Sequence, residues 1–152
     1  GIADRDRQRL AEQLVKVGEA PDLIDALKRL GEHYAVDEPQ YKRVLVAEIG
    51  VESTRNPAVR ESFAACDKFC LESFTQLFAR AQAAGRVDPA ADPADLARVI
   101  AIIGDGMFWR RAVDPTFDAK AIMPLIGRMV GLLIATPGQP ASAPSTVTEP
   151  TS

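Results

Sequence analysis

The fold is decided by residues 92–113, which read DPADLARVIAIIGDGMFWRRAV. Asp92 is a favoured helix N-cap, Pro93 suits the first helical position, and Asp95 suits the positive end of the helix dipole. The helix that starts here carries apolar side chains on two faces: Leu96, Ile100, Ile103 and Met107 on one, Ile102, Trp109 and Val113 on the other. Such a helix is stable only inside a bundle or against a second chain.

Similar signals mark helices on both sides of this stretch. Asn56-Pro57 starts a helix that runs to about residue 84, where Gly85 is a natural stop. Further helices are predicted over about residues 4–17, from Pro21 onward, from Pro39 onward and after Asp118. After Pro39 we expect four side chains to face inward: Tyr41, Val44, Leu45 and Ile49. The helix after Pro57 carries one apolar face, which comprises Val59, Phe63, Cys66, Cys70, Phe74, Leu77 and Ala81.

The helix after Asp118 is nearly all apolar, and Pro124 should bend it or delay its start. Gly127 and Gly131 are four residues apart, so they share a face that permits close helix–helix approach. From residue 136 the composition shifts to Pro, Ser, Thr and Ala. We therefore predict one six-helix domain over residues 1–135 and a disordered tail over 136–152.

The composition excludes several classes of function. With a formal net charge of −3, the chain has no overall basic character that would favour nucleic acid. The sequence also shows no secretory signal, no run long enough to cross a bilayer and only two cysteines, which predicts a cytoplasmic protein. One histidine and the C-x-x-x-C spacing of the cysteines give no catalytic or metal motif, so we expect no enzyme, no metal and no cofactor.

The order of these elements resembles the C-terminal regulatory domain of the tetracycline-repressor (TetR) family of transcription factors. The resemblance is carried by four features: STRNPAVRESF at 53–63, AGRVDPAADPADLARVI at 84–100, the GDG at 104–106 and the closing apolar helix. It implies an all-α bundle whose last two long helices form a four-helix interface in a homodimer. It also implies a small effector, a repressor function, and operator DNA read by an N-terminal helix-turn-helix that this chain lacks.

On this basis we predict two groups of functional residues. The effector, which we expect to be hydrophobic or aromatic, would meet Tyr34, Phe63, Cys66, Phe74, Asp105, Phe108 and Trp109. The dimer interface would contain Ile102, Gly106, Leu125, Arg128, Met129, Leu132 and Leu133. Effector binding would shift the spacing of the two DNA-reading units, and the helix at residues 4–17 would carry that motion.

Alternatives remain open at several positions. Asp105, expected to be buried, is either an acid that contacts a polar or cationic effector or the partner of an arginine, Arg110 or Arg111, from the second chain. Aromatic side chains at helical spacing are often only core, and Cys66 and Cys70 are more typical of small apolar core residues than of a redox or metal pair. For the whole chain, the alternative is a helical interaction module that dimerises without an effector.

Overall fold

The computed structural model describes residues 2–137, so the predicted tail at 136–152 lies almost wholly outside the described residues. This part of the chain forms six α-helices and no strand, which confirms the all-α fold. The helices are α1 (Ile2–Glu19), α2 (Leu23–Glu32), α3 (Gln40–Ser53), α4 (Pro57–Ala83), α5 (Pro93–Val113) and α6 (Ala119–Ile134). A π-helical turn, η1 (His33–Asp37), continues α2.

The predicted helix starts are confirmed by their capping hydrogen bonds. Asn56 Oδ1 accepts from the backbone N–H groups of Ala58 and Val59, at 3.1 and 3.4 Å. Asp92 and Asp118 cap α5 and α6 in the same way, at 2.8 and 3.0 Å. Pro124 lies inside α6 without ending it. Gly85 follows the end of α4 with a φ of 74°, which glycine adopts readily and other residues rarely.

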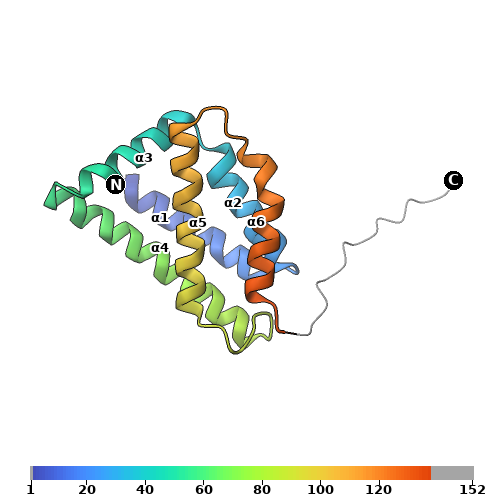
Figure 1. Ribbon diagram of the computed structural model, residues 1–152. Coiled ribbons are helices and arrows are strands. Elements are labelled where there is room, and N and C mark those ends of the chain that lie inside the picture. The colour runs from blue at the N-terminus through green and yellow to red at the C-terminus, as the bar shows by residue number, and fades with distance from the viewer. Residues whose placement is uncertain (1, 138–152) are drawn as a thin grey trace.

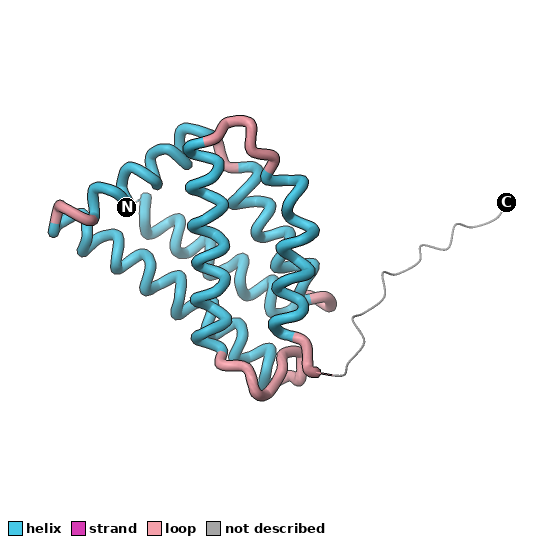
Figure 2. Tube along the Cα trace, in the orientation of Figure 1, coloured by secondary structure: helices cyan, strands magenta, loops and turns pink. Residues whose placement is uncertain are grey.

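Figure 1 shows α5 and α6 side by side, with α1 and α2 behind them, while α3 and α4 meet at a corner away from α6. Short loops join the helices, at the top and bottom of the view, at the corner between α3 and α4 and at the side between α1 and α2 (Figure 2). Helix α5 packs against α4 and, near its end, against α3, and α6 packs mainly against α2. A Cβ placed on Gly131 would stand 3.9 Å from the Ile24 side chain of α2, which is an ordinary contact, so this face of α6 packs against α2 without requiring glycine there.

The core sits where α1, α2, α5, α6 and the second half of α4 meet. Its centre is Phe78, which is 0% exposed. The loop after α4 is fixed to its surroundings, because Arg86 donates to the carbonyls of Gly18 and Ala20 at 2.9 and 2.6 Å. A smaller cluster of Ala35, Met107, Ala119 and Met123 lies near η1. These contacts bury one stripe of α5 and leave its opposite stripe free.

The prediction that the apolar side chains of α3 face inward is wrong. Tyr41, Val44, Leu45 and Ile49 are all exposed, and Tyr41 is 69% exposed. The buried residue of α3 is instead Arg43, which is 2% exposed. The physical reason is that Arg43 bonds to backbone oxygen at the end of η1, which turns the apolar sides of α3 away from the core.

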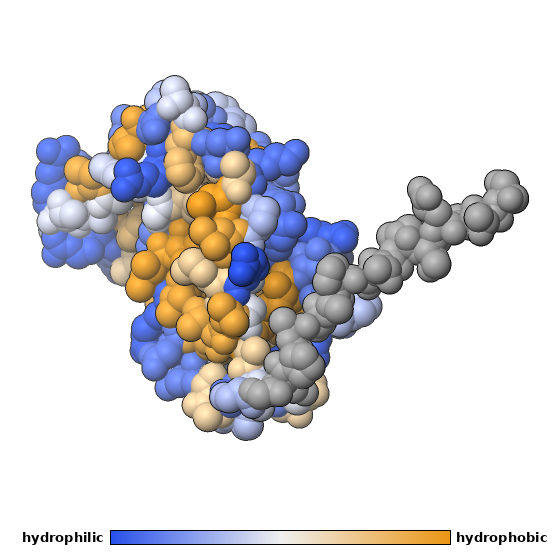
Figure 3. Space-filling model, turned by 45° about the vertical axis from the view of Figure 1, so that its right-hand side comes forward, coloured by the Kyte–Doolittle hydropathy of each residue, from blue (hydrophilic) through white to orange (hydrophobic). Residues whose placement is uncertain are grey.

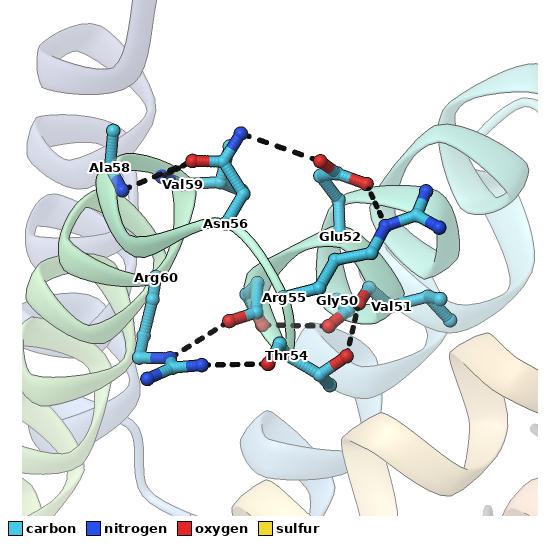
Figure 4. A network of polar contacts seen from close by, with 10 residues as sticks. Gly50, Val51, Glu52, Thr54, Arg55, Asn56, Ala58, Val59 and Arg60 are labelled. Atoms are coloured by element: carbon cyan, nitrogen blue, oxygen red, sulfur yellow. Dashed lines mark hydrogen bonds and ion pairs between the residues drawn. The ribbon is translucent and has the colours of Figure 1, made fainter.

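The corner between α3 and α4 is held by polar contacts within a short stretch of chain (Figure 4). Arg60 of α4 donates to the carbonyls of Ser53 and Thr54, at 2.9 and 2.7 Å. Glu52 pairs with Arg55 at 2.6 Å and accepts from Asn56 at 3.4 Å. These bonds fix the angle between the two helices.

Candidate functional site

One side of α5 and α6 forms a continuous apolar surface, which we call the α5–α6 face. Its most exposed members are Ile102 at 69% and Leu132 at 77%. It comprises Ile102, Trp109, Val113, Leu125, Met129, Leu132 and Leu133. In Figure 3 hydrophobic residues gather over this side of the molecule, with a hydrophilic group within them. An apolar patch of this kind typically marks an interaction site.

The predicted dimer residues lie together on this face. Gly106 has no atom within 4 Å of where a Cβ would stand, so it leaves open space beside Ile102. Arg128 is exposed between Leu125 and Leu132 on α6. The opposite stripe of α6, with Met123, Val130 and Ile134, is buried in the chain's own core. Both helices therefore bury one apolar stripe and present another.

A second group of residues lies where the first half of α4 faces α5. Burial and the charge of Asp67 raise the pKa of Asp105 above its ordinary value. Burial, and then its neighbour Cys66, raises the pKa of the Cys70 thiol to about 12. Asp105 and Cys66 are nevertheless exposed in the chain, so the expectation that both are buried is wrong. The whole stretch from Glu61 to Lys68 in the first half of α4 is exposed, so the apolar face of this helix is covered only in its second half.

The structure separates the seven predicted effector residues into three places. Phe63 and Cys66 are exposed on the first half of α4, and Asp105 is exposed on α5. Phe74 and Tyr34 pack against the main core, and the Tyr34 hydroxyl donates to Gln13 Oε1 at 2.6 Å. Trp109 belongs to the α5–α6 face, and Phe108 is half-buried.

Two shallow clefts lie elsewhere. One, of about 260 Å³, is lined by residues of α1 and α2 with His33 of η1 and has Lys16, Arg29 and His33 among its walls. The other, of about 320 Å³, lies mainly between α1 and α4 and includes Ser73 and Arg80. Neither cleft contains any of the seven predicted effector residues.

A ring of hydrogen bonds that the sequence pattern did not reveal joins η1, α3 and α5. Arg111 Nη1 donates to the carbonyls of Ala35 and Val36, the latter at 2.6 Å. Arg43 Nη2 donates to the same Val36 carbonyl at 2.9 Å. Arg43 Nη1 donates to Gln40 Oε1 at 3.1 Å, and Gln40 Nε2 returns to the Arg111 carbonyl at 2.8 Å. The local sequence gave no signal for this ring, because Arg43 directly follows Lys42 and precedes the apolar run VLVA at 44–47.

Comparisons with known proteins agree with this architecture. Residues 24–135 match the family model described as BetI-type transcriptional repressor, C-terminal. Among solved structures, Salmonella enterica GusR matches with a TM-score of 0.67 and 22% identity, over 88% of this chain and 69% of that chain. No curated protein matches the sequence.

The fold defines the C-terminal regulatory domain of a TetR-family transcriptional regulator, as the resemblance in the sequence implied. Because the family match covers well over half of the chain, the protein belongs to the family of BetI-type transcriptional repressors. Within residues 2–137 no helix is long and apolar enough to cross a membrane. The same residues contain no group of three or more His, Cys, Asp or Glu side chains that could hold a metal ion.

Proposed function

We propose that residues 1–135 form the effector-binding and dimerisation domain of a repressor. In this proposal two copies pair through the α5–α6 face into a four-helix interface. A small hydrophobic or aromatic effector binds beside the first half of α4, and binding changes the spacing of two N-terminal helix-turn-helix units outside these residues. The observation that carries the proposal is the α5–α6 face, where two neighbouring helices present apolar stripes to solvent.

Pairing is supported by the character and the position of this face. Fully burying one leucine side chain contributes about 1.5–3 kcal/mol. In a two-fold dimer every such residue is buried twice, because the same patch occurs on both partners. Arg128 lies within the patch. In a two-fold dimer the Arg128 side chains of the two copies repel each other, so the copies pair in a register that keeps these two charges apart.

Sedimentation equilibrium of the chain tests the pairing. The chain is expected to be a dimer, and Leu132→Glu is expected to weaken it at least about 100-fold, because a charge would be buried twice. Leu45→Glu on α3 is the matched control, since Leu45 is 51% exposed but lies outside the α5–α6 face. A monomeric wild type, or loss of the dimer only in the control, would refute the interface.

Binding of an effector beside α4 is supported by apolar side chains that the chain leaves uncovered there, with two carboxylates close by. Phe63 and Cys66 are exposed, and the pKa of Asp105 is raised partly by Asp67. An effector pocket needs mostly apolar walls with a few polar groups. Phe63 and Cys66 would supply the apolar wall of such a pocket, and Asp67 and Asp105 would supply its polar groups.

A thermal-shift screen of small aromatic and aliphatic compounds tests the sensing function. A true effector raises the melting temperature, because it binds only the folded chain. Phe63→Ala and Asp105→Asn are expected to weaken that binder, whereas Leu125→Ala on α6 leaves it unchanged. Quenching of Trp109 by the binder would extend the pocket to α5. If no compound stabilises a confirmed dimer, the alternative of an interaction module without an effector takes its place.

A further inference from the structure

The π-helical turn η1 is held from two sides by charged hydrogen bonds. Two of its carbonyls, at Ala35 and Val36, accept from Arg111 near the end of α5, and Val36 also accepts from Arg43 of α3. Hydrogen bonds from charged groups are stronger than neutral ones. Arg111 stands on the same helix as Trp109 and Val113 of the α5–α6 face, so a movement of α5 at that face also moves the side chain that binds η1.

The other end of η1 is joined to α1. Tyr34 is the second residue of η1, and its hydroxyl donates to Gln13 Oε1 of α1 at 2.6 Å. Burial is the main reason that the pKa of Tyr34 is raised, so the hydroxyl keeps its proton and remains a donor. Tyr34 also stacks edge-on with His33, with 5.1 Å between the ring centroids. A continuous route of contacts therefore leads from α5 through η1 to α1.

We propose that η1 is a mechanical relay, in which the Arg111 end of α5 sets the backbone of η1 and η1 sets the position of α1 through Tyr34. The functional role of the relay rests on the proposed function, in which α5 belongs to the dimer interface and α1 transmits the motion to the DNA-reading units. A movement of α5 would shift Arg111, loosen the Val36 carbonyl and release Gln13.

Two features of η1 make it suited to change shape. A π turn holds one residue more than the α-helical pattern allows, and such turns are frequent at functional sites. Return to the α-helical pattern would rotate Tyr34 away from Gln13, because each residue occupies about 100° of a helix. The clamp is also incompletely satisfied, since Arg43 Nε is buried without a hydrogen-bond partner. Such a buried donor lowers the cost of rearrangement.

The neighbouring charges leave the clamp intact. Glu38, which follows η1, is paired with Lys42 Nζ at 3.1 Å, so its carboxylate does not draw Arg111 away. Arg111 also lowers the pKa of Arg43, after burial as the main cause, because the two guanidinium groups lie close together. The mutual repulsion of the two arginines is held in check by the Ala35 and Val36 carbonyls, and it favours separation once those bonds loosen.

Amide hydrogen exchange of the full chain, read by mass spectrometry on α1 peptides around Gln13, tests the relay. Arg111→Lys keeps the charge but loses the planar fork, and we expect it to speed exchange in α1 about tenfold through its effect on η1. Tyr34→Phe should speed it by a similar factor. The double variant should be no faster than either single variant, because both interrupt the same route.

Matched controls separate the relay from general loosening. Arg110→Lys changes the neighbouring arginine, and Tyr41→Phe changes the other tyrosine, which is exposed on α3; both should leave α1 exchange within about twofold of wild type. Gln40→Ala removes an exposed member of the hydrogen-bond ring that joins η1, α3 and α5. It replaces Arg111→Lys in the experiment if Arg111→Lys does not fold. Unchanged α1 exchange in Arg111→Lys, or effects that multiply in the double variant, would overturn the relay. Sedimentation of the same samples reports on the dimer separately.

Discussion

The two halves of α4 carry similar apolar spacing but lie in different surroundings. In the first half, all residues from Glu61 to Lys68 are exposed, Phe63 among them. In the second half, Leu77, Phe78 and Ala81 are buried in the main core. The second half is covered by Leu14 and Val17 of α1 and by the start of α5, whereas the first half shares its corner with α3, which is itself exposed. Helical periodicity identifies an apolar face, but it does not say whether anything covers that face.

This difference bears on function, since a fold that needed α4 only for stability would cover both halves. The covered half fixes the loop to α5 and thereby the α5–α6 face. The uncovered half brings Phe63, Cys66 and Asp67 to one surface, next to Asp105. We infer that the second half holds the domain together and that the first half is available to a ligand.

The largest expected effect separates the two halves directly. Phe78→Ala should lower the free energy of unfolding by about 3–5 kcal/mol, because a filled core position becomes a cavity. Phe63→Ala should lower it by less than about 1 kcal/mol, since that ring is already partly in water. Urea unfolding of both variants measures the two values. Equal losses would show that the first half of α4 is covered in solution.

The next effect contrasts two arginines that both donate to backbone carbonyls. Arg43→Met should cost about 2 kcal/mol of unfolding free energy, because the Val36 carbonyl then keeps Arg111 as its donor but loses its charged bond to Arg43. Arg60→Met, at the exposed corner, should cost less than about 1 kcal/mol, since water replaces its bonds. Denaturant unfolding of the two variants measures both free energies. A larger loss in Arg60→Met than in Arg43→Met would show that the α3–α4 corner contributes more to stability than the ring at η1.

A smaller effect concerns the start of α4. Asn56→Ala should cost about 1 kcal/mol, because the amides of Ala58 and Val59 lose their acceptor. Asn56→Asp is the matched control, as its carboxylate retains the acceptor and suits the helix dipole. Hydrogen exchange should speed up in the first turns of α4 in the alanine variant and not around Phe78. Equal acceleration along the whole helix would mean that the halves do not unfold separately.

The smallest effect is a dependence on pH at Asp105. Its pKa is raised, so between the unfolded and folded pKa values the folded chain binds more protons and its stability falls as the pH rises. Asp105→Asn should therefore stabilise the chain at neutral pH, by well under about 1 kcal/mol because the group is exposed. The gain should vanish below about pH 4.

Thermal melts at acidic and neutral pH provide the measurement for Asp105→Asn, with Asp114→Asn as the control of opposite sign. The amide and hydroxyl of Thr116 donate to Asp114 Oδ1 at 2.9 and 2.6 Å. These bonds lower the pKa of Asp114, so its stabilising contribution is present at neutral pH and is lost on acidification. A loss of stability in Asp105→Asn at neutral pH would contradict the proximity of Asp67.

The positions of the helices could be predicted from the sequence because their signals are local. Asn56, Asp92 and Asp118 cap amides two or three residues away, and Gly85 supplies the positive φ at the end of α4. The two stripes of α5 were also visible, since their residues recur at helical spacing. The burial of α3 and the placement of the seven effector residues could not be predicted in this way, as both depend on which element lies opposite.

Local signals in the sequence therefore specified the six helices, the capped starts of α4, α5 and α6, and an apolar surplus on α5 and α6. Only the tertiary structure decided that Arg43 would be buried while Tyr41 and Leu45 stay in water, and that Tyr34 would bind Gln13. The reason is physical: Arg111 and Val36 are separated by 75 residues, and Tyr34 and Gln13 by 21. Bonds over such separations form only after the helices have packed, and no local pattern encodes them.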